Sequence, residues 1–190
     1  DRVVGAVHDE LRGLRDGGRD VINVELDCTP MNYWAINHFQ ADGGVQVTAS
    51  HNGPKYNGFK VSGAGAAPID FASGLNRVEQ FVLNAEQNGV PAAAATVGSL
   101  LEPEGVLEHY VDWMSGFVEP GERRLRIGID CANGMGGQFL PGFLAHWPQI
   151  EAVPLFWELD GTFPNHPADP LDPQNLFDLQ QLMRREKLDF

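Results

Sequence analysis

The stretch "GGVQVTASHNGPKYNGFKV", residues 43–61, combines a predicted strand with a polar loop and is the most informative segment for the fold. It begins with a Val-rich segment, 43–49, that is typical of a β-strand, and it continues into a polar loop that contains Ser50, His51 and Asn52. Asn57-Gly58 is a tight-turn signal, and an extended segment that includes Lys60 follows it. We expect Ser50 to lie at the carboxyl end of a parallel strand, which is where α/β sheets place their ligands.

The segments around this stretch alternate between helical and extended patterns. Apolar residues at helical spacing, Val3, Val4, Val7, Leu11 and Leu14, predict a first helix that ends at Gly17-Gly18. A strand is predicted over 20–26 and helices over 30–39 and 73–87, with Pro30 at a plausible first helical position. This order completes one α/β unit.

A second α/β unit is predicted after an Ala-, Gly- and Pro-rich segment, 88–103, where we place a domain boundary. Its expected elements are a helix over 104–118, a buried strand over 125–130, a Gly-rich loop with a helix over 138–146, a strand over 151–157 and a helix that starts at Asp172-Pro173. The fold class is therefore α/β, with two consecutive domains, 1–103 and 104–190, of mixed sheets covered by helices. No internal repeat is evident at residue level.

Both ends of the chain look as if they were cut inside folded units. No strand precedes the opening helix, and the final residues "LDF" resemble the first steps of another strand. We therefore expect a fold that is truncated at both ends.

The charge and cysteine content exclude several classes of function. Lys and Arg number 13 against 26 Asp and Glu, a net charge of −13, which argues against nucleic acid and anionic lipid as partners. No apolar run approaches the roughly 20 residues of a membrane-spanning helix, and the N-terminal segment lacks the order of a signal peptide. Cys28 and Cys131 lie far apart without a CxxC pair, so a cytoplasmic location is the default expectation.

Three interpretations of Ser50 follow from its neighbours. It could be part of a polar turn that bonds only the local backbone. It could be an acyl-hydrolase nucleophile, but Thr48 and Asn52 stand where the GxSxG elbow needs glycines, and the adjacent His51 is a poor base for it. It could carry a phosphoryl group, with loop amides as donors and His51 or Lys60 to move protons.

Longer motifs add a family resemblance to this third interpretation. The segments "TASHN" and "YNGFK" resemble the active-site loop of the α-D-phosphohexomutases, the phosphoglucomutase and phosphomannomutase superfamily. The resemblance extends through "TPMNYWAINHFQADGGVQVTASHN" to "RIGIDCANGMGG" and "DGTFPNHPADPLDPQNLFDL", which are similar to the first and second of the family's four domains.

The resemblance implies an isomerase that interconverts hexose 1-phosphate and hexose 6-phosphate through a bisphosphosugar. Ser50 would be the phosphoserine, and its phosphate oxygen would bind Mg²⁺. His51 and Lys60 would position the loop and transfer protons, and Asn52 and Lys60 would contact the substrate. Hexose 1,6-bisphosphate would be the activator. The family's other Mg²⁺ ligands, in a DGDxDR loop, and its domains III and IV have no counterpart in this sequence, so the isolated chain is predicted to be inactive.

Two further points stand beside the resemblance. Relatives commonly read SHNP, whereas Gly53 follows Asn52 here, which predicts a looser loop. The alternative function is a non-catalytic module that keeps the fold and binds a phosphosugar or a partner. The choice between glucose and mannose stays open.

The remaining polar and aromatic motifs are expected to be structural. We expect "CANGMGG", with Asp130 and Cys131, to serve close strand-to-helix packing. His166 and Asp169 are expected to form turns, and Trp34 and Trp113 to pack in the core.

Overall fold

The computed structural model describes residues 2–119 and 121–190, and their side chains from residue 9 onward. The chain divides into two compact units. One consists of Asp1–Thr48 and Gly58–Glu104, and the other of Ala49–Asn57 and Gly105–Phe190.

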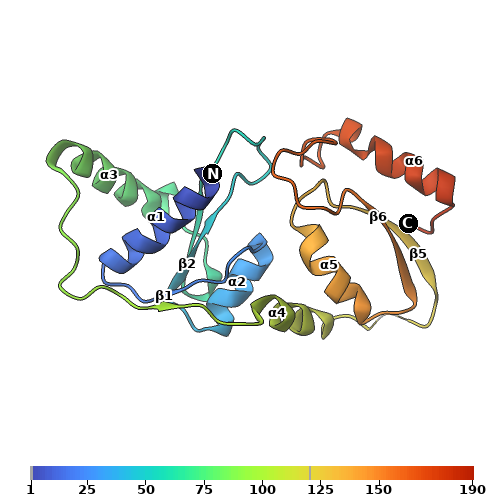
Figure 1. Ribbon diagram of the computed structural model, residues 1–190, viewed down its shortest axis with the longest axis horizontal. Helices are drawn as coiled ribbons and strands as arrows, with labels where there is room; N and C mark the ends of the chain where they lie inside the picture. Colours follow the sequence, from blue (N-terminus) through green and yellow to red (C-terminus); the bar gives the residue numbers. More distant parts are fainter. Residues whose placement is uncertain (1, 120) are drawn as a thin grey trace. The chain divides into compact units, whose positions relative to one another are not determined.

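The first unit combines three α-helices with two small sheets (Figure 1). Its elements are α1 (Arg2–Asp16), β1 (Val21–Ile22), α2 (Thr29–His38), β2 (Gly43–Val47), β3 (Phe59–Gly63), the 3₁₀ turn η1 (Ala64–Ala66), the π-helical turn η2 (Phe71–Leu75), α3 (Asn76–Asn88) and β4 (Leu100–Leu101). Helix α1 confirms the predicted opening helix, although the side chains of Val3, Val4 and Val7 lie outside the described residues.

The pairing of β2 corrects one expectation. β2 runs antiparallel to β3, with Val47 opposite Phe59 and Gln46 opposite Lys60, so Ser50 does not follow a parallel strand. Parallel neighbours need a crossover of a dozen or more residues, whereas the segment between these two strands is shorter and returns as a hairpin loop.

The hairpin packs against α2, whose side chains lie close to the backbone of β2 at Gly44. Pro30 occupies the first turn of the helix, as predicted, and Met31, Trp34 and Ile36 are buried. A Cβ atom at Gly44 would lie 2.7 Å from the end of the Ile36 side chain, which would have to move to admit a larger residue there.

The parallel sheet of the first unit differs from the prediction in two ways: β1 is shorter than the predicted strand, and β1 pairs with a strand, β4, that was not predicted. β1 covers only two residues of the predicted strand 20–26, because the Asn23 side chain accepts a hydrogen bond from the Glu25 amide and Glu25 has a φ of 61°. Its partner β4 lies within 88–103, the segment in which the sequence predicts a domain boundary and no strand. The predicted helix over 73–87 is present as η2 and α3, and the Asp70 side chain caps its start by accepting from the Ser73 amide.

The second unit is a two-stranded parallel sheet with helices on either side (Figure 1). Its elements are α4 (Val106–Ser115), β5 (Leu125–Asp130), α5 (Gly136–Ala145), β6 (Ile150–Leu155), the 3₁₀ turn η3 (Pro173–Leu176) and α6 (Phe177–Glu186). The Asp172 side chain accepts from the Gln174 amide and so begins the last helical segment where Asp172-Pro173 predicted it. These elements confirm the second predicted series.

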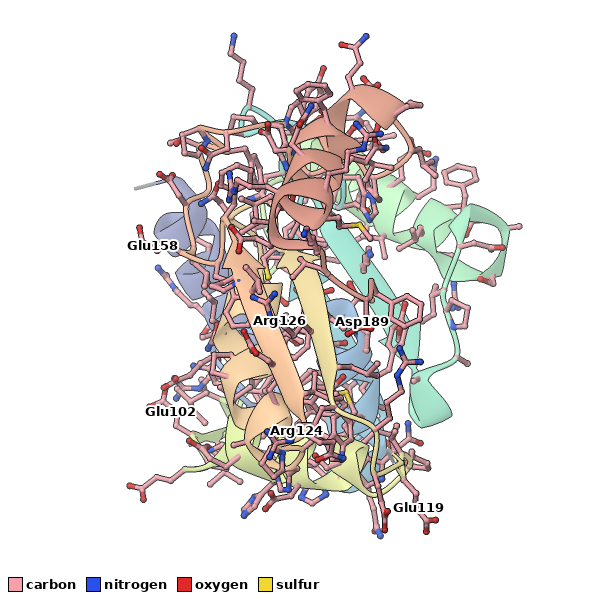
Figure 2. The ribbon with its side chains drawn as sticks, turned by 90° about the vertical axis from the view of Figure 1, so that its right-hand side faces the viewer. Glu102, Glu119, Arg124, Arg126, Glu158 and Asp189 are labelled. Carbon is pink, nitrogen blue, oxygen red and sulfur yellow. The ribbon has the colours of Figure 1, made fainter. Side chains whose placement is uncertain are left out.

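The last residues of the chain lie along the free edge of β5. The Asp189 amide donates to the Arg126 carbonyl, and the Gly128 amide donates to the Phe190 carbonyl. The Asp189 carboxylate also accepts from the Arg126 amide at 2.9 Å and forms an ion pair with Arg123 at 2.9 Å; Figure 2 labels Arg126 and Asp189. The segment "LDF", which was expected to be strand-like, thus pairs with the backbone of β5.

The two tryptophans expected in the core differ. Trp34 is 7% exposed, as predicted, but Trp113 is 49% exposed, so that expectation is wrong. Tyr110 takes the buried place on this face of α4, and the Trp113 ring stacks on it with the centroids 6.2 Å apart.

Candidate active site

The loop between β2 and β3 carries three of the predicted site residues. The Thr48 amide donates to the Gly58 carbonyl at 2.9 Å and closes the base of the loop. Within the loop, both the backbone and the side-chain amide of Asn52 donate to the Ala49 carbonyl, each at 3.0 Å. Ser50, His51 and Asn52 are all exposed.

The chain does not reverse at Asn57-Gly58, where the sequence predicts a tight turn. The closing bond makes Gly58 the last step of the hairpin ladder, so these two residues are not a two-residue turn and that expectation is wrong. The reversal is spread over the whole loop, including the turn in which the Tyr56 amide donates to the Gly53 carbonyl. A Cβ at Gly53 would meet no atom within 4 Å, so no packing contact demands glycine there.

Ser50 has a strained backbone. Its φ of 54° lies in the left-handed region, which residues other than glycine seldom adopt. Such a conformation costs on the order of 1 kcal/mol and recurs at functional sites, where the surrounding structure holds it. Ser50 is the residue of this loop that adopts a positive φ; among the described residues, Glu25, Gln40 and six other non-glycine residues outside the loop do so as well.

Lys60 lies on β3 in the first unit and is half-buried. Its Nζ donates to Oγ1 of Thr29 at 3.0 Å, and the Thr29 hydroxyl donates to Oε1 of Gln46 at 2.8 Å. Sequence reasoning treated Thr29 only as part of a strand-to-helix junction. The signal that could have found this group is Gln46, a polar residue in the middle of a Val-rich strand.

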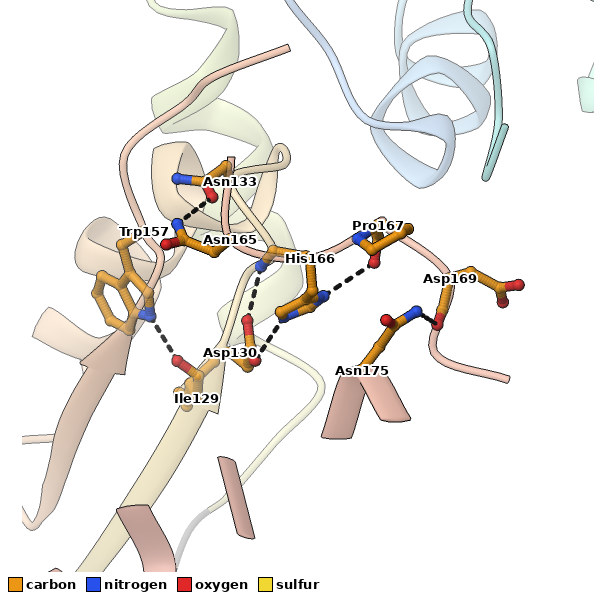
Figure 3. Close-up of polar contacts among 10 residues, drawn as sticks. Ile129, Asp130, Asn133, Trp157, Asn165, His166, Pro167, Asp169 and Asn175 are labelled. Carbon is orange, nitrogen blue, oxygen red and sulfur yellow. Dashed lines mark hydrogen bonds and ion pairs between the residues drawn. The ribbon is translucent and has the colours of Figure 1, made fainter. Parts of the chain in front are cut away.

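A second polar group gathers at the carboxyl ends of β5 and β6 (Figure 3). Nε2 of His166 lies 3.0 Å from Oδ2 of Asp130, and these side chains are 13% and 9% exposed. The Asn165 amide nitrogen donates to the side-chain oxygen of Asn133, and the side-chain nitrogen of Asn133 donates to the Glu158 carbonyl. The interpretation of His166 as a turn former is therefore corrected, because the buried Asp130 carboxylate 36 residues earlier supplies its partner.

The other motifs of this unit have the structural roles expected of them. A Cβ at Gly137, in "CANGMGG", would overlap the carbonyl oxygen of Trp157, so the loop allows α5 to begin directly against the chain after β6. Asp169 caps a turn by accepting from the Leu171 amide at 3.0 Å. Burial, followed by the negative charge of Asp130, raises the pKa of the Cys131 thiol to about 11, which disfavours a nucleophilic thiolate.

Metal-binding side chains do not gather in the described part of the chain. Residues 2–119 and 121–190 contain no group of three or more His, Cys, Asp or Glu that could hold an ion. Ser50 alone would supply one oxygen ligand, whereas Mg²⁺ prefers six in octahedral geometry. The residues present therefore do not make a magnesium site by themselves.

Two consecutive segments of the chain match the first two domains of one enzyme family. The family description "Phosphoglucomutase/phosphomannomutase, alpha/beta/alpha domain I" matches residues 6–89, and the description of domain II matches residues 108–190. The chain belongs to the phosphoglucomutase/phosphomannomutase family.

Individual members of the phosphoglucomutase/phosphomannomutase family agree with this assignment. A phosphoglucomutase of Neisseria gonorrhoeae is 40% identical over 168 residues, which are 88% of this chain and 35% of that protein. A phosphomannomutase of Escherichia coli is 33% identical over 184 residues, 94% of this chain and 40% of that protein. The chain thus spans 35% to 40% of the length of these two relatives.

Solved structures of the family share the fold. A phosphoglucomutase/phosphomannomutase family protein of Burkholderia thailandensis superposes with a TM-score of 0.80 at 30% identity, over 97% of this chain and 39% of that one. Two consecutive α/β domains, as predicted, are therefore an arrangement that this chain shares with its family. Among the described residues, no helix has the length and apolar character that crossing a membrane requires.

Proposed function

We propose that this chain is the phosphoserine-bearing part of an enzyme that interconverts hexose 1-phosphates and hexose 6-phosphates, with Ser50 as the phosphoryl carrier. The observation that carries the proposal is the exposed Ser50, held at a φ of 54° in a loop closed by the bond between Thr48 and Gly58. Membership of the phosphoglucomutase/phosphomannomutase family supports the reaction class.

The proposed reaction consists of two phosphoryl transfers. In the first, a sugar hydroxyl oxygen forms a bond to phosphorus as the bond from phosphorus to Oγ of Ser50 breaks, and the hydroxyl proton passes to a base. In the second, Oγ of Ser50 attacks the other phosphate of the bisphosphosugar, and the departing sugar oxygen takes up a proton. The net result moves the phosphate between the two ends of the sugar without consuming any other reactant.

Lys60 and His51 are the proposed proton carriers, and Asn52 and Lys60 are the proposed substrate contacts. Lys60 is the stronger candidate because it is half-buried and has a fixed hydrogen-bond partner in Thr29, whereas His51 is exposed. A proton carrier held in one place loses less activity to misalignment than a mobile one.

We further propose that the active enzyme extends beyond this chain. Relatives are more than twice as long, and the described residues lack a metal-binding cluster. In this proposal the remaining Mg²⁺ ligands and the sugar-binding domains III and IV lie outside residues 1–190, with the domain boundary near residue 103. Cys28 and Cys131 form no disulfide among the described residues, and we propose a cytoplasmic location for the enzyme.

The experiment is a coupled mutase assay on the complete enzyme with hexose 1,6-bisphosphate as activator. Replacing the phosphoryl carrier in Ser50→Ala should lower turnover by about a thousandfold or more. Ser115→Ala is the matched control and should retain turnover, because among the described residues the Ser115 hydroxyl donates to the Val111 carbonyl one helical turn back and to nothing else. A Ser50→Ala enzyme with wild-type turnover would refute the proposal.

A further inference from the structure

A continuous line of side-chain hydrogen bonds leads from Lys60 to a carboxylate in the first unit. Nζ of Lys60 donates to Thr29 at 3.0 Å, Thr29 donates to Gln46 at 2.8 Å, and Nε2 of Gln46 donates to Oδ1 of Asp27 at 2.8 Å. The antiparallel register places Gln46 directly opposite Lys60, so both side chains stand on the same face of the hairpin. The line thus connects β3, the start of α2, β2 and the loop before α2.

The chemistry of these groups fixes which partner donates and which accepts in each hydrogen bond. Asp27 offers an acceptor, which turns the amide nitrogen of Gln46 toward it, at 2.8 Å from the carboxylate and 3.3 Å from the Asp27 carbonyl. The amide oxygen must then face Thr29, whose hydroxyl hydrogen points to Gln46. A lone pair of the Thr29 oxygen is left for Lys60, which can only donate to it.

Burial makes this arrangement rigid. Gln46 is 7% exposed, and Oδ2 of Asp27 is buried with no hydrogen-bond partner among the described residues. Burial raises the pKa of Asp27 even though hydrogen bonds from Gln46 and Asn32 oppose the shift. The buried Gln46 amide is bonded at both its oxygen and its nitrogen, to Thr29 and Asp27 respectively, and these bonds hold it in one orientation.

We propose that Asp27, Gln46 and Thr29 form a positioning relay that holds Nζ of Lys60 in one place and commits one of its three N–H donors. The catalytic consequence of the relay rests on the proposed function, in which Lys60 carries a proton. Thr29 and Gln46 are positioning residues that act through Lys60. The hydroxyl of Thr29 is the link that can be removed with the smallest change in shape.

The first test measures the relay on the 190-residue chain without any assay of turnover. Competitive labelling with an amine-reactive acetylating reagent, read by peptide mass spectrometry, compares Lys60 with the exposed Lys55. Thr29→Val should raise the labelling rate of Lys60 relative to Lys55 by roughly fivefold, the worth of one hydrogen bond. Thr29→Ser, which keeps the hydroxyl, should restore the wild-type ratio.

The matched control is Thr96→Val, a change of the same kind at an exposed position of the same unit, and it should leave the ratio unchanged. Circular dichroism of each variant checks that the fold is kept. An unchanged ratio in Thr29→Val, an equal rise in Thr96→Val, or no restoration by Thr29→Ser overturns the relay.

The second test separates the relay from the proposed function in the complete enzyme. Thr29→Val should lower kcat by about tenfold while KM stays within about twofold, because misplacing a proton carrier weakens the chemical step more than binding. In a Lys60→Met background, Thr29→Val should cause no additional loss of kcat. A full additional loss would mean that Thr29 does not act through Lys60 and would overturn the relay.

The single variant Lys60→Met tests the proposed proton-carrying role of Lys60. If Lys60→Met keeps wild-type turnover, the proposed proton role of Lys60 fails, while the labelling ratio still decides whether the relay exists. If Lys60→Met loses turnover and Thr29→Val keeps it, the proposed function stands and the relay is overturned.

Discussion

The imidazole of His166 bridges two acceptors: its Nε2 lies 3.0 Å from the carboxylate of Asp130, and its Nδ1 lies 2.9 Å from the Pro167 carbonyl. Only the doubly protonated ring can donate to both. Burial by itself lowers the pKa of His166, but the hydrogen bonds to Pro167 and Asp130 and the charges of Asp130 and Asp178 raise it above its usual range overall. The pair ties the loop after β6 to the end of β5.

We predict that His166→Gln destabilises the protein in a pH-dependent way. Because the pKa is raised in the folded state, the stabilisation is fully present below the unfolded value, about pH 6.5, and is lost as pH rises through the raised folded value. Urea unfolding should give a loss of about 2 kcal/mol at about pH 6 that shrinks toward about pH 9. His51→Gln, at an exposed position, is the control and should change little. A difference between wild type and His166→Gln that does not vary with pH would contradict the prediction.

Glu10 should make stability depend on pH over a lower range. Burial, and secondarily the charge of Asp27, raises the pKa of Glu10 from 4.5 to about 7. The folded state therefore favours the neutral acid, and the free energy of unfolding should fall as pH rises through that interval. Glu10→Gln should remove about 1 kcal/mol of this fall, a figure discounted because solvent screens the partly exposed carboxyl.

The measurement for Glu10 is the wild-type curve of unfolding free energy against pH beside those of two variants. The exposed neighbour Asp9 supplies the control variant Asp9→Asn, which should keep the wild-type slope. Curves for wild type and Glu10→Gln that run parallel would show that Glu10 keeps an ordinary pKa.

Gly137→Ala should destabilise the second unit strongly. The added methyl group would overlap the Trp157 carbonyl, a backbone atom that cannot rotate away. We expect a loss of about 2 kcal/mol or more in the free energy of unfolding, typical of overpacking. Gly161→Ala is the matched control, since a Cβ there meets nothing within 4 Å, and it should stay within about 0.5 kcal/mol of wild type. Equal stabilities for the two variants would count against close packing at Gly137.

Local patterns in the sequence predicted most of the elements and missed those that depend on distant partners. Apolar spacing and caps such as Asp172 act within a few residues, so α1, α2, α6 and the strands β5 and β6 could be located from the sequence. β4 is two residues long and exists because Leu100 pairs with Val21, 79 positions away. No periodicity can develop over so short a strand.

In the candidate site, too, the local motif could be recognised from the sequence, whereas the contacts between distant residues could not. The loop motif predicted that Ser50 is a reactive serine, whereas the left-handed φ of Ser50 is a property of the folded loop that no motif indicates. The bond from Lys60 to Thr29 spans 31 residues and the contact of His166 with Asp130 spans 36, so neither is visible as spacing. The sequence signal for each contact is a single polar residue among apolar ones, Gln46 or Asp130. Such a residue does not by itself identify its partner.

The measurement that tests the central claim most directly is phosphopeptide mass spectrometry of the complete enzyme after exposure to hexose 1,6-bisphosphate and Mg²⁺. Our account predicts one added phosphoryl group, located on Ser50, that is lost when excess hexose 6-phosphate is supplied and is absent from Ser50→Ala. A phosphoryl group on another residue, or none on Ser50 in an enzyme that turns over, would contradict it.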